Sequence, residues 1–452
     1  MKQESNLTDL KKRILFTIFI LLVYRFGTFV PIPGIDTKVL EKIFSGSASN
    51  IFGMINLFSG GALERMSIFA LNIMPYITAS IIMQLLTSMH SGLEALKKEG
   101  EYGKSKINQY TRYLTIALAF FQSFGVYYAL SNSENNAFIS DSNIFLWTTV
   151  VSLVGGTVML MWFGEKISSS GIGNGISLII FVGIVSSLPS SVVAMFDLLK
   201  TGVYSFFVIL AFFVLFTMAV ILVCFIEKTN RKIKIQYPNA SMMKSAGMSD
   251  SSFLPLKINL SGVIPPIFAS SVLMFPVAIV QITGVDGNSF LSMLQRGGML
   301  YVILFSSLIL FFSYFYSSII FNTQDVANNL KKSNCFILGI RPGVATSEHL
   351  DKIISRLTLI GAIYLIVICA IPETLIARTS IPLHIGGTGI LIMVNVVMDL
   401  INQIQSHMFA GKYGSGINKK KRVKIRGWIL FFWELLDLEK ERRLLYYQKI
   451  LT

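Results

Sequence analysis

The residues of this sequence that could carry chemistry are few, and they form no catalytic or metal-binding pattern. Three cysteines and four histidines are scattered along 452 residues, without the spacing of a zinc site or a disulfide framework. There is no H-E-x-x-H or G-x-S-x-G motif, and GIGNG at 171–175 lacks the G-K-[ST] that completes a phosphate-binding loop. The sequence therefore predicts no enzyme and no cofactor, and an energy source is expected on a partner.

The elements that carry these residues are long apolar runs. Hydrophobic residues make up 53% of the chain and charged residues only 14%, too few to face water on every side. Because about 20 residues cross a bilayer as a helix, we predict ten transmembrane helices at 14–30, 73–89, 114–131, 144–163, 174–195, 203–226, 260–283, 300–321, 354–371 and 384–402. The polar stretch 1–13 lies before the first run, which we interpret as a membrane helix rather than a cleaved leader.

Charged residues inside the predicted spans are almost absent. Two of the few exceptions are Arg25 and Asp399, and each is interpreted as reaching the interface or making a structural hydrogen bond. An ion-coupled transporter usually carries ionisable groups near the midplane. A small-solute secondary transporter with inverted repeats is therefore only the alternative reading.

Lysine and arginine predict the topology. The formal net charge is +15, and the basic residues concentrate at 1–13, 90–113, 227–259, 322–353 and 403–426. The alternate loops contain few, so we place the former on the cytoplasmic side. Both termini are then cytoplasmic, which requires an even number of spans. Ten spans divide into two five-helix halves, 14–195 and 203–402, that enter from opposite sides, as inverted repeats do.

Seven ordered stretches make the chain similar to the SecY family, the pore subunit of the Sec protein translocase. They are PIPGID (31–36), FSGGALERMSIFALNIMPYITASIIMQLL (58–86), KKEGEYGKSKINQYTRY (97–113), GIGNGISLIIF (171–181), LPLKINLSGVIPPIFASS (254–271), NLKKSNCFILGIRPG (329–343) and GGTGILIMVNVVMDL (386–400). The resemblance implies an all-α membrane protein of ten helices around a central pore. Unfolded polypeptides would cross it, and hydrophobic segments would leave into lipid by a lateral gate.

The resemblance also implies a ring of apolar side chains at the narrowest point of the pore. The matching positions are Ile77, Ile81, Ile176, Ile180, Ile264 and Ile392. Branched aliphatic groups would fit around any extended chain, and an empty ring would resist wetting. From spacing alone, isoleucines at i and i+4 would be read as a packing stripe.

The run at 57–70 is too short to span and resembles the family's plug, a half-helix beneath the ring. Its core is Phe58, Ser59, Gly60, Gly61, Ala62, Leu63, Glu64 and Arg65. The two glycines permit a bend, and the charged pair would be tolerated in a water-filled vestibule. Without the resemblance, an amphipathic surface helix would fit equally well.

The lateral gate is expected between spans 73–89 and 260–283. Pro75, Pro265 and Pro266 lie near the ends of these spans. Proline removes a backbone donor and breaks or kinks a helix, so the three are interpreted as gate hinges, with a plain helix start as the other reading.

Two basic loops, 227–259 and 322–353, are expected to dock a SecA-like motor, the ribosome or both. The residues chosen are Arg231, Lys232, Lys244 and Arg341, the last within a tight-turn composition, GIRPG. Positive-inside bias alone would account for most of the lysines.

The remaining predictions concern the partners of the protein and its cellular location. By resemblance, the partners are SecE-like and SecG-like subunits, secretory and membrane-protein substrates, and membrane lipid. The expected location is a bacterial plasma membrane or the inner membrane of an organelle. The extension 427–452, beyond the basic tail, is read as an interfacial helix or a disordered segment.

Overall fold

The computed structural model describes residues 2–34, 59–131, 142–202, 204–236, 252–283, 298–379 and 386–413. Three of the predicted features, Phe58, Lys244 and the extension 427–452, lie outside these residues. Leu10–Gln405 forms one compact unit, and the ends of the chain, Met1–Asp9 with Ser406–Thr452, form another. The description below concerns the larger unit.

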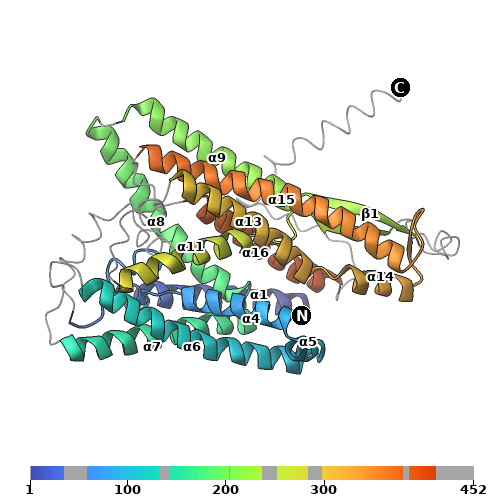
Figure 1. Ribbon diagram of the computed structural model, residues 1–452, viewed down its shortest axis with the longest axis horizontal. Coiled ribbons are helices and arrows are strands. Elements are labelled where there is room, and N and C mark those ends of the chain that lie inside the picture. The colour runs from blue at the N-terminus through green and yellow to red at the C-terminus, as the bar shows by residue number, and fades with distance from the viewer. Residues whose placement is uncertain are drawn as a thin grey trace. The chain divides into compact units, whose positions relative to one another are not determined.

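Each of the ten predicted spans coincides with a helix in the described part of the chain (Figure 1). These helices are α1 (Lys2–Gly27), α4 (Met74–Met89), α6 (Glu101–Ser131), α7 (Ser142–Ser170), α8 (Gly175–Lys200), α9 (Phe206–Lys228), α11 (Ile264–Thr283), α13 (Met299–Ile320), α15 (Val344–Thr379) and α16 (Gly387–Tyr413). Six of them, α7, α8, α9, α13, α15 and α16, contain segments long and apolar enough to cross a membrane. Met74–Met89 and Ile264–Leu273 are apolar but shorter.

Several helices are longer than the apolar runs that predicted them. α6 begins at Glu101 although its run begins at 114, and α15 begins at Val344 although its run begins at 354. Hydropathy detects only the apolar part of a helix, whereas backbone hydrogen bonding continues into the polar residues before it. Two shorter helices, α5 (Ser91–Lys98) and α14 (Thr323–Lys332), are mostly polar and were not predicted.

The helices pack in two groups along the chain. α4, α6, α7 and α8 contact one another in sequence order, as do α11, α13 and α15 (Figure 1). α11 also contacts α4 and α6 and so connects the two groups. One core cluster holds Tyr24, Ile180 and Ile392 from α1, α8 and α16. A second holds Phe305, Leu365 and Leu391 from α13, α15 and α16.

A small antiparallel sheet stands outside the helices and was not predicted. Its strand order is β2-β1-β3, with β1 at Asn230–Gln236, β2 at Ser252–Lys257 and β3 at Phe336–Ile337. Ile233 and Ile235 of β1 are buried and alternate with exposed lysines. A cluster of Ile233, Leu256 and Ile337 packs on Leu350, Ile354 and Leu357 of α15. The sheet therefore fixes the base of the two basic loops on one long helix.

Candidate functional site

The six isoleucines predicted for the ring come from four helices. Ile77 and Ile81 lie on α4, Ile176 and Ile180 on α8, and the other two on α11 and α16. Ile180 and Ile392 are buried in one core cluster, and Ile77 and Ile176 pack against it. Ile81 and Ile264 belong to a neighbouring cluster, which Ile77 also contacts. The structure thus brings isoleucines of all four helices into two adjoining clusters that share Ile77.

The contact between α4 and α11 is apolar. On α4 the contributing side chains are Ile77, Ile81 and Leu85, and on α11 they are Ile264 and Phe268. The Phe268 ring meets Phe312 of α13 edge-on, with centroids 5.5 Å apart, and Tyr316 at 6.1 Å. Such edge-to-face pairs are favourable because the positive edge of one ring meets the negative face of the other. α4 and α11 are therefore in contact in this state of the protein.

The three predicted hinge prolines all occupy the first turn of a helix. Pro75 directly follows Met74, the first residue of α4, and Pro265 and Pro266 follow Ile264, the first residue of α11. Proline is tolerated there because its missing N–H would have no partner within the helix. The position therefore agrees with the helix-start reading. Prolines inside helices lie at Pro189 of α8, Pro276 of α11 and Pro372 of α15.

The described part of the predicted plug, residues 59–70, belongs to a buried segment that we call segment 59–73. It is less regular than the predicted half-helix, since residues 60–73 form successive turns and only Ser59 is helical. Gly60 and Gly61 adopt φ of +65° and +83°, outside the helical region. Ser59, Ala62, Leu63 and Met66 are buried. A surface helix is excluded for these residues because residues 60–73 form turns rather than a helix.

Segment 59–73 is enclosed by three helices and by the chain after α1. The Ile32 N–H donates to the Met66 carbonyl at 3.0 Å, and the Ile68 N–H donates to the Val30 carbonyl at 3.2 Å. A Cβ added to Gly60 would lie 2.8 Å from the Gly183 carbonyl oxygen of α8, and one on Gly156 of α7 would overlap the Ile68 carbonyl oxygen. Glycine is required where backbones approach so closely.

Arg25 of α1 makes a polar side-chain contact with this segment. Its Nη1 donates to the Gly60 carbonyl at 3.0 Å and to the Thr28 hydroxyl at 3.3 Å. The guanidinium also lies 4.8 Å from the Phe29 ring centroid, and Arg65 lies 4.4 Å from the same centroid. Of the two readings given for Arg25, the structural hydrogen bond is confirmed.

The residues predicted to dock a partner lie in β1 of the small sheet and in a nearby turn. Arg231 and Lys232 of β1 are exposed. Arg341 is exposed in the predicted tight turn, between Gly339 with φ +79° and Gly343 with φ +106°. The Thr346 hydroxyl donates to the Arg341 carbonyl at 2.9 Å and fixes the turn on the start of α15. A guanidinium in such a turn is presented outward, where it can meet carboxylates or phosphates.

Comparison with known proteins identifies the family. The SecY family model matches residues 67–401. "Protein translocase subunit SecY" of Rickettsia bellii is 48% identical over 426 residues, which cover 93% of this chain and 98% of that protein.

The chain belongs to the SecY family.

Solved structures agree in fold. "The structure of a protein conducting channel" aligns with a TM-score of 0.67 at 17% identity, covering 91% of this chain and 95% of that one. "Sec61 in the Canine ribosome-channel complex from the endoplasmic reticulum" aligns with a TM-score of 0.64 at 17% identity, covering 91% and 95%. At this identity the likeness concerns the fold, and each alignment covers 91% of this chain.

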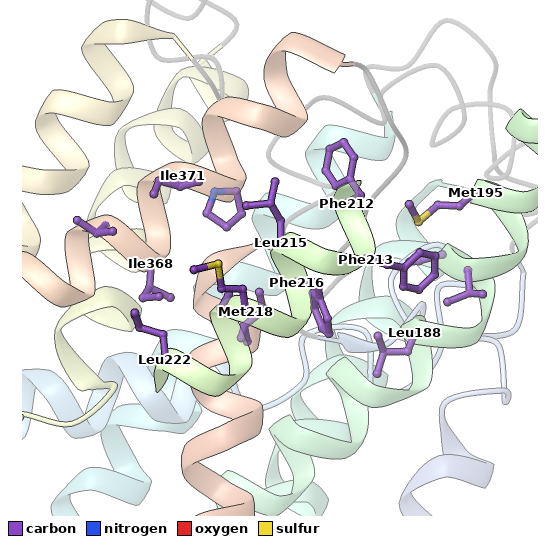
Figure 2. Close-up of a pocket in the computed structure, with 16 residues that line it drawn as sticks. Leu188, Met195, Phe212, Phe213, Leu215, Phe216, Met218, Leu222, Ile368 and Ile371 are labelled. Carbon is purple, nitrogen blue, oxygen red and sulfur yellow. The ribbon is translucent and has the colours of Figure 1, made fainter. Parts of the chain in front are cut away.

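A pocket in this SecY-family chain lies between α8, α9, α15 and α16 (Figure 2). Leu188, Phe216 and Ile368 are among its lining residues, and Ser191 is the polar one. None of the sixteen lining side chains carries a charge. A coupled transporter needs charged or polar ligands at its substrate site, so this pocket offers no such site.

Sequence reasoning missed one buried polar group in the SecY-family chain. Glu227, in the last turn of α9, is buried and accepts a hydrogen bond from Asn259. Glu227 falls just past the end of the predicted span 203–226, beside Lys228, where a solvated acid was the natural reading. The strand that follows could have been found, because I-K-I in NRKIKIQ alternates with period two.

Proposed function

We propose that this chain conducts unfolded polypeptides through the centre of its helix bundle and releases hydrophobic segments sideways between α4 and α11. As a SecY-family protein with the fold of a protein-conducting channel, it is the channel subunit of a translocon. The observation that carries the finer proposal is the apolar contact of α4 with α11 through Ile81 and Phe268. Helices that pack through apolar side chains without hydrogen bonds can separate and pack together again at a small cost in free energy.

The ring is proposed at the six isoleucines. Its support is that α4, α8, α11 and α16 all contribute to adjoining apolar clusters centred on Ile77. Aliphatic side chains make no directional bonds, so they accommodate a passing chain of any sequence. When the channel is empty they close on each other and exclude water and ions.

Segment 59–73 is proposed to act as the plug. Residues 60–73 of this buried segment form turns rather than regular helix, and Arg25 and the backbone of Val30 and Ile32 bond it to its surroundings. Turns of this kind unfold locally more easily than a helix, because few hydrogen bonds must break. Polypeptide entry would displace the segment, and its return would reseal the channel.

The prolines at the starts of α4 and α11 are proposed as the pivots of gate opening. A helix that begins at proline has no hydrogen bond from that residue to the preceding turn. Segment 59–73 ends at α4, and the 259–263 stretch leads into α11, so both gate helices begin at a change of backbone direction.

Docking is proposed at Arg231, Lys232, Lys244 and Arg341. A Sec61 structure among the similar folds is described as part of a ribosome-channel complex, and the exposed basic residues suit a partner rich in phosphate or carboxylate. We propose a ribosome or a SecA-like motor as the energy source, SecE-like and SecG-like subunits beside the channel, and cytoplasmic chain termini. A bacterial plasma membrane is the proposed location.

The test uses the full chain in liposomes with its partner subunits. A stalled polypeptide with a hydrophobic segment of about 20 residues is presented, and photo-crosslinkers are placed at exposed positions on α4 and α11. Crosslinks to both helices are expected, together with protease protection of the polypeptide. Uptake of a small solute without polypeptide protection would contradict the proposal, and crosslinks confined to other helices would move the gate.

A further inference from the structure

A buried hydrogen bond joins α9 to the stretch that precedes α11. Glu227, in the last turn of α9, is 9% exposed, and Asn259 is 3% exposed. The Asn259 Nδ2 donates to the Glu227 Oε1 at 2.9 Å. A hydrogen bond to a carboxylate is stronger than one between neutral groups. If it breaks without a substitute, the buried Glu227 carboxylate loses this donor, which is costly.

The two residues close the base of the β1–β2 hairpin. Lys228 and Thr229 lead from Glu227 into β1, and Ile258 leads from β2 to Asn259. Asn230 pairs with Lys257 at the end of the ladder, and the Ile258 N–H donates to the Thr229 carbonyl at 3.5 Å. The Glu227–Asn259 hydrogen bond thus joins the two chain segments by their side chains just beyond the last paired residues of the strands. The hairpin carries Arg231 and Lys232, which were proposed above to meet a partner.

Asn259 also contacts the backbone that begins the gate helix. Its Nδ2 donates to the Gly262 carbonyl at 3.0 Å, and its Oδ1 accepts from the Ser261 hydroxyl at 3.2 Å. Gly262 has a positive φ of +62°, and Val263 then leads into α11 at Ile264. One amide side chain therefore bonds the hairpin base on one side and the start of α11 on the other.

Neighbouring helices limit how these parts can move. A Cβ on Gly361 of α15 would lie 3.2 Å from the Ile258 carbonyl oxygen. A Cβ on Gly262 would lie 3.8 Å from the Asn395 Nδ2 of α16. The hairpin itself packs on α15 through Ile233 and Leu256. Because these contacts leave little free space around the 259–262 stretch, a tilt of the hairpin on α15 displaces that stretch.

We propose that Glu227 is a positioning residue, which through Asn259 transmits partner docking at the β1–β2 hairpin to the start of α11. This inference rests on the proposed function, because it assumes that α11 moves when the gate opens. Without the hydrogen bond, the partner would still bind the exposed residues of β1. Its binding would no longer displace α11, so gate opening would lose its dependence on docking.

Three variants of Glu227 separate the hydrogen bond from charge and volume. Glu227→Gln keeps an oxygen acceptor at the same reach and removes the charge. Glu227→Leu keeps the volume and removes the acceptor. Glu227→Asp keeps the charge but shortens the side chain by one carbon, which breaks the direct contact with Asn259. This variant therefore tests the hydrogen bond even if the leucine variant folds poorly. Asp399→Leu, at an exposed carboxylate of α16, controls for the loss of one negative charge.

The measurements are ribosome affinity and crosslinking of a stalled hydrophobic segment to α11, both with the full chain in liposomes. The leucine and aspartate variants should bind ribosomes as the parent does while losing about tenfold in crosslinking, the effect of 1.4 kcal/mol. The glutamine and Asp399 variants should match the parent. Normal crosslinking in the leucine and aspartate variants, or equal loss in the glutamine variant, would overturn the inference. No crosslinking in the parent itself would instead contradict the proposed function.

Discussion

Arg25 and Gly60 are joined by a hydrogen bond of 3.0 Å between a guanidinium Nη1 and a backbone carbonyl, although they lie far apart in the sequence. The same guanidinium contacts Phe29, and Arg65 approaches that ring as well. A charge in an apolar span is costly unless it is paired or bonded to backbone. Here the carbonyl of segment 59–73 supplies that bond, so the stability of α1 and the position of the segment depend on each other.

Replacing Arg25 should therefore loosen segment 59–73. In Arg25→Leu the Gly60 carbonyl loses its charged donor, which stabilises by about 1.5–3 kcal/mol. We expect ion conductance of the resting channel in planar bilayers to rise by at least about fivefold, as 1 kcal/mol of destabilisation implies. Lys12→Gln, which removes a charge from the exposed start of α1, should leave conductance unchanged. Parent-like conductance in Arg25→Leu would contradict a role for this bond.

Gly60 and Gly61 form a matched pair for a second prediction. Both have positive φ, so alanine at either position adds backbone strain of about 1 kcal/mol. A Cβ on Gly60 would in addition lie 2.5 Å from the Ser186 hydroxyl and 2.8 Å from the Gly183 carbonyl, whereas Gly61 faces open space. Gly60→Ala should raise resting conductance well above Gly61→Ala in the same bilayer assay. Equal effects of the two would mean that contact with α8 does not hold the segment.

The proposed ring predicts a leak when a buried isoleucine becomes polar. Ile180→Ser places a hydroxyl in the cluster that Ile392 and Ile77 share, which favours wetting of the constriction. Resting conductance should rise about tenfold, the effect of 1.4 kcal/mol on the closed state. Ile360→Ser is the control, because Ile360 is exposed on the outer side of α15. A leak of equal size in the control would point to general destabilisation.

The positions of the ten spans could be predicted from the sequence because each is a run of apolar residues near bilayer length. The ends of the helices could not be predicted in the same way. Residues 101–113 and 344–353 are helical but polar, and hydropathy alone assigns such residues to loops. The sheet was missed for a related reason. β1 and β2 pair although residues 237–251 separate them in the sequence, and only the alternation in NRKIKIQ indicates a strand.

The candidate site was less predictable than the fold. Residues 57–70 were expected as a half-helix, but in their described part Gly60 and Gly61 adopt conformations that end a helix, and turns follow. The contacts of Arg25 and Glu227 join residues distant in the chain, so no local pattern reports them. Arg25 lies within the predicted span 14–30, where an interface position or a structural hydrogen bond was expected, and Glu227 lies just past the predicted span 203–226.

The aromatic contacts of Phe268 predict the ease of gate opening. Phe268→Ala removes edge-to-face pairs with Phe312 and Tyr316, each stabilising by about 0.5–1.5 kcal/mol. The gate should then admit segments of lower hydrophobicity, measured as crosslinking of a graded leucine–alanine series to α11. Phe311→Ala, beside Phe312 but 59% exposed, should not shift the threshold. A threshold unchanged in Phe268→Ala would show that this packing does not limit opening.

Arg341 provides the last prediction, which concerns docking rather than gating. Its turn is fixed by Gly339, Gly343 and the Thr346 hydroxyl, so a substitution at the exposed Arg341 side chain changes the surface charge and leaves the turn intact. Arg341→Glu should weaken binding of ribosomes or a motor ATPase by about tenfold, since a favourable contact becomes a repulsive one of at least about 1.4 kcal/mol.

Lys331→Glu, at an exposed position in the last turn of α14, makes the same charge change and should have a smaller effect. Sedimentation with proteoliposomes at two salt concentrations measures both, and the difference between them should shrink at high salt because screening shortens the range of the charge. Equal losses in the two variants would assign docking to net charge, and no loss in Arg341→Glu would remove this residue from the docking surface.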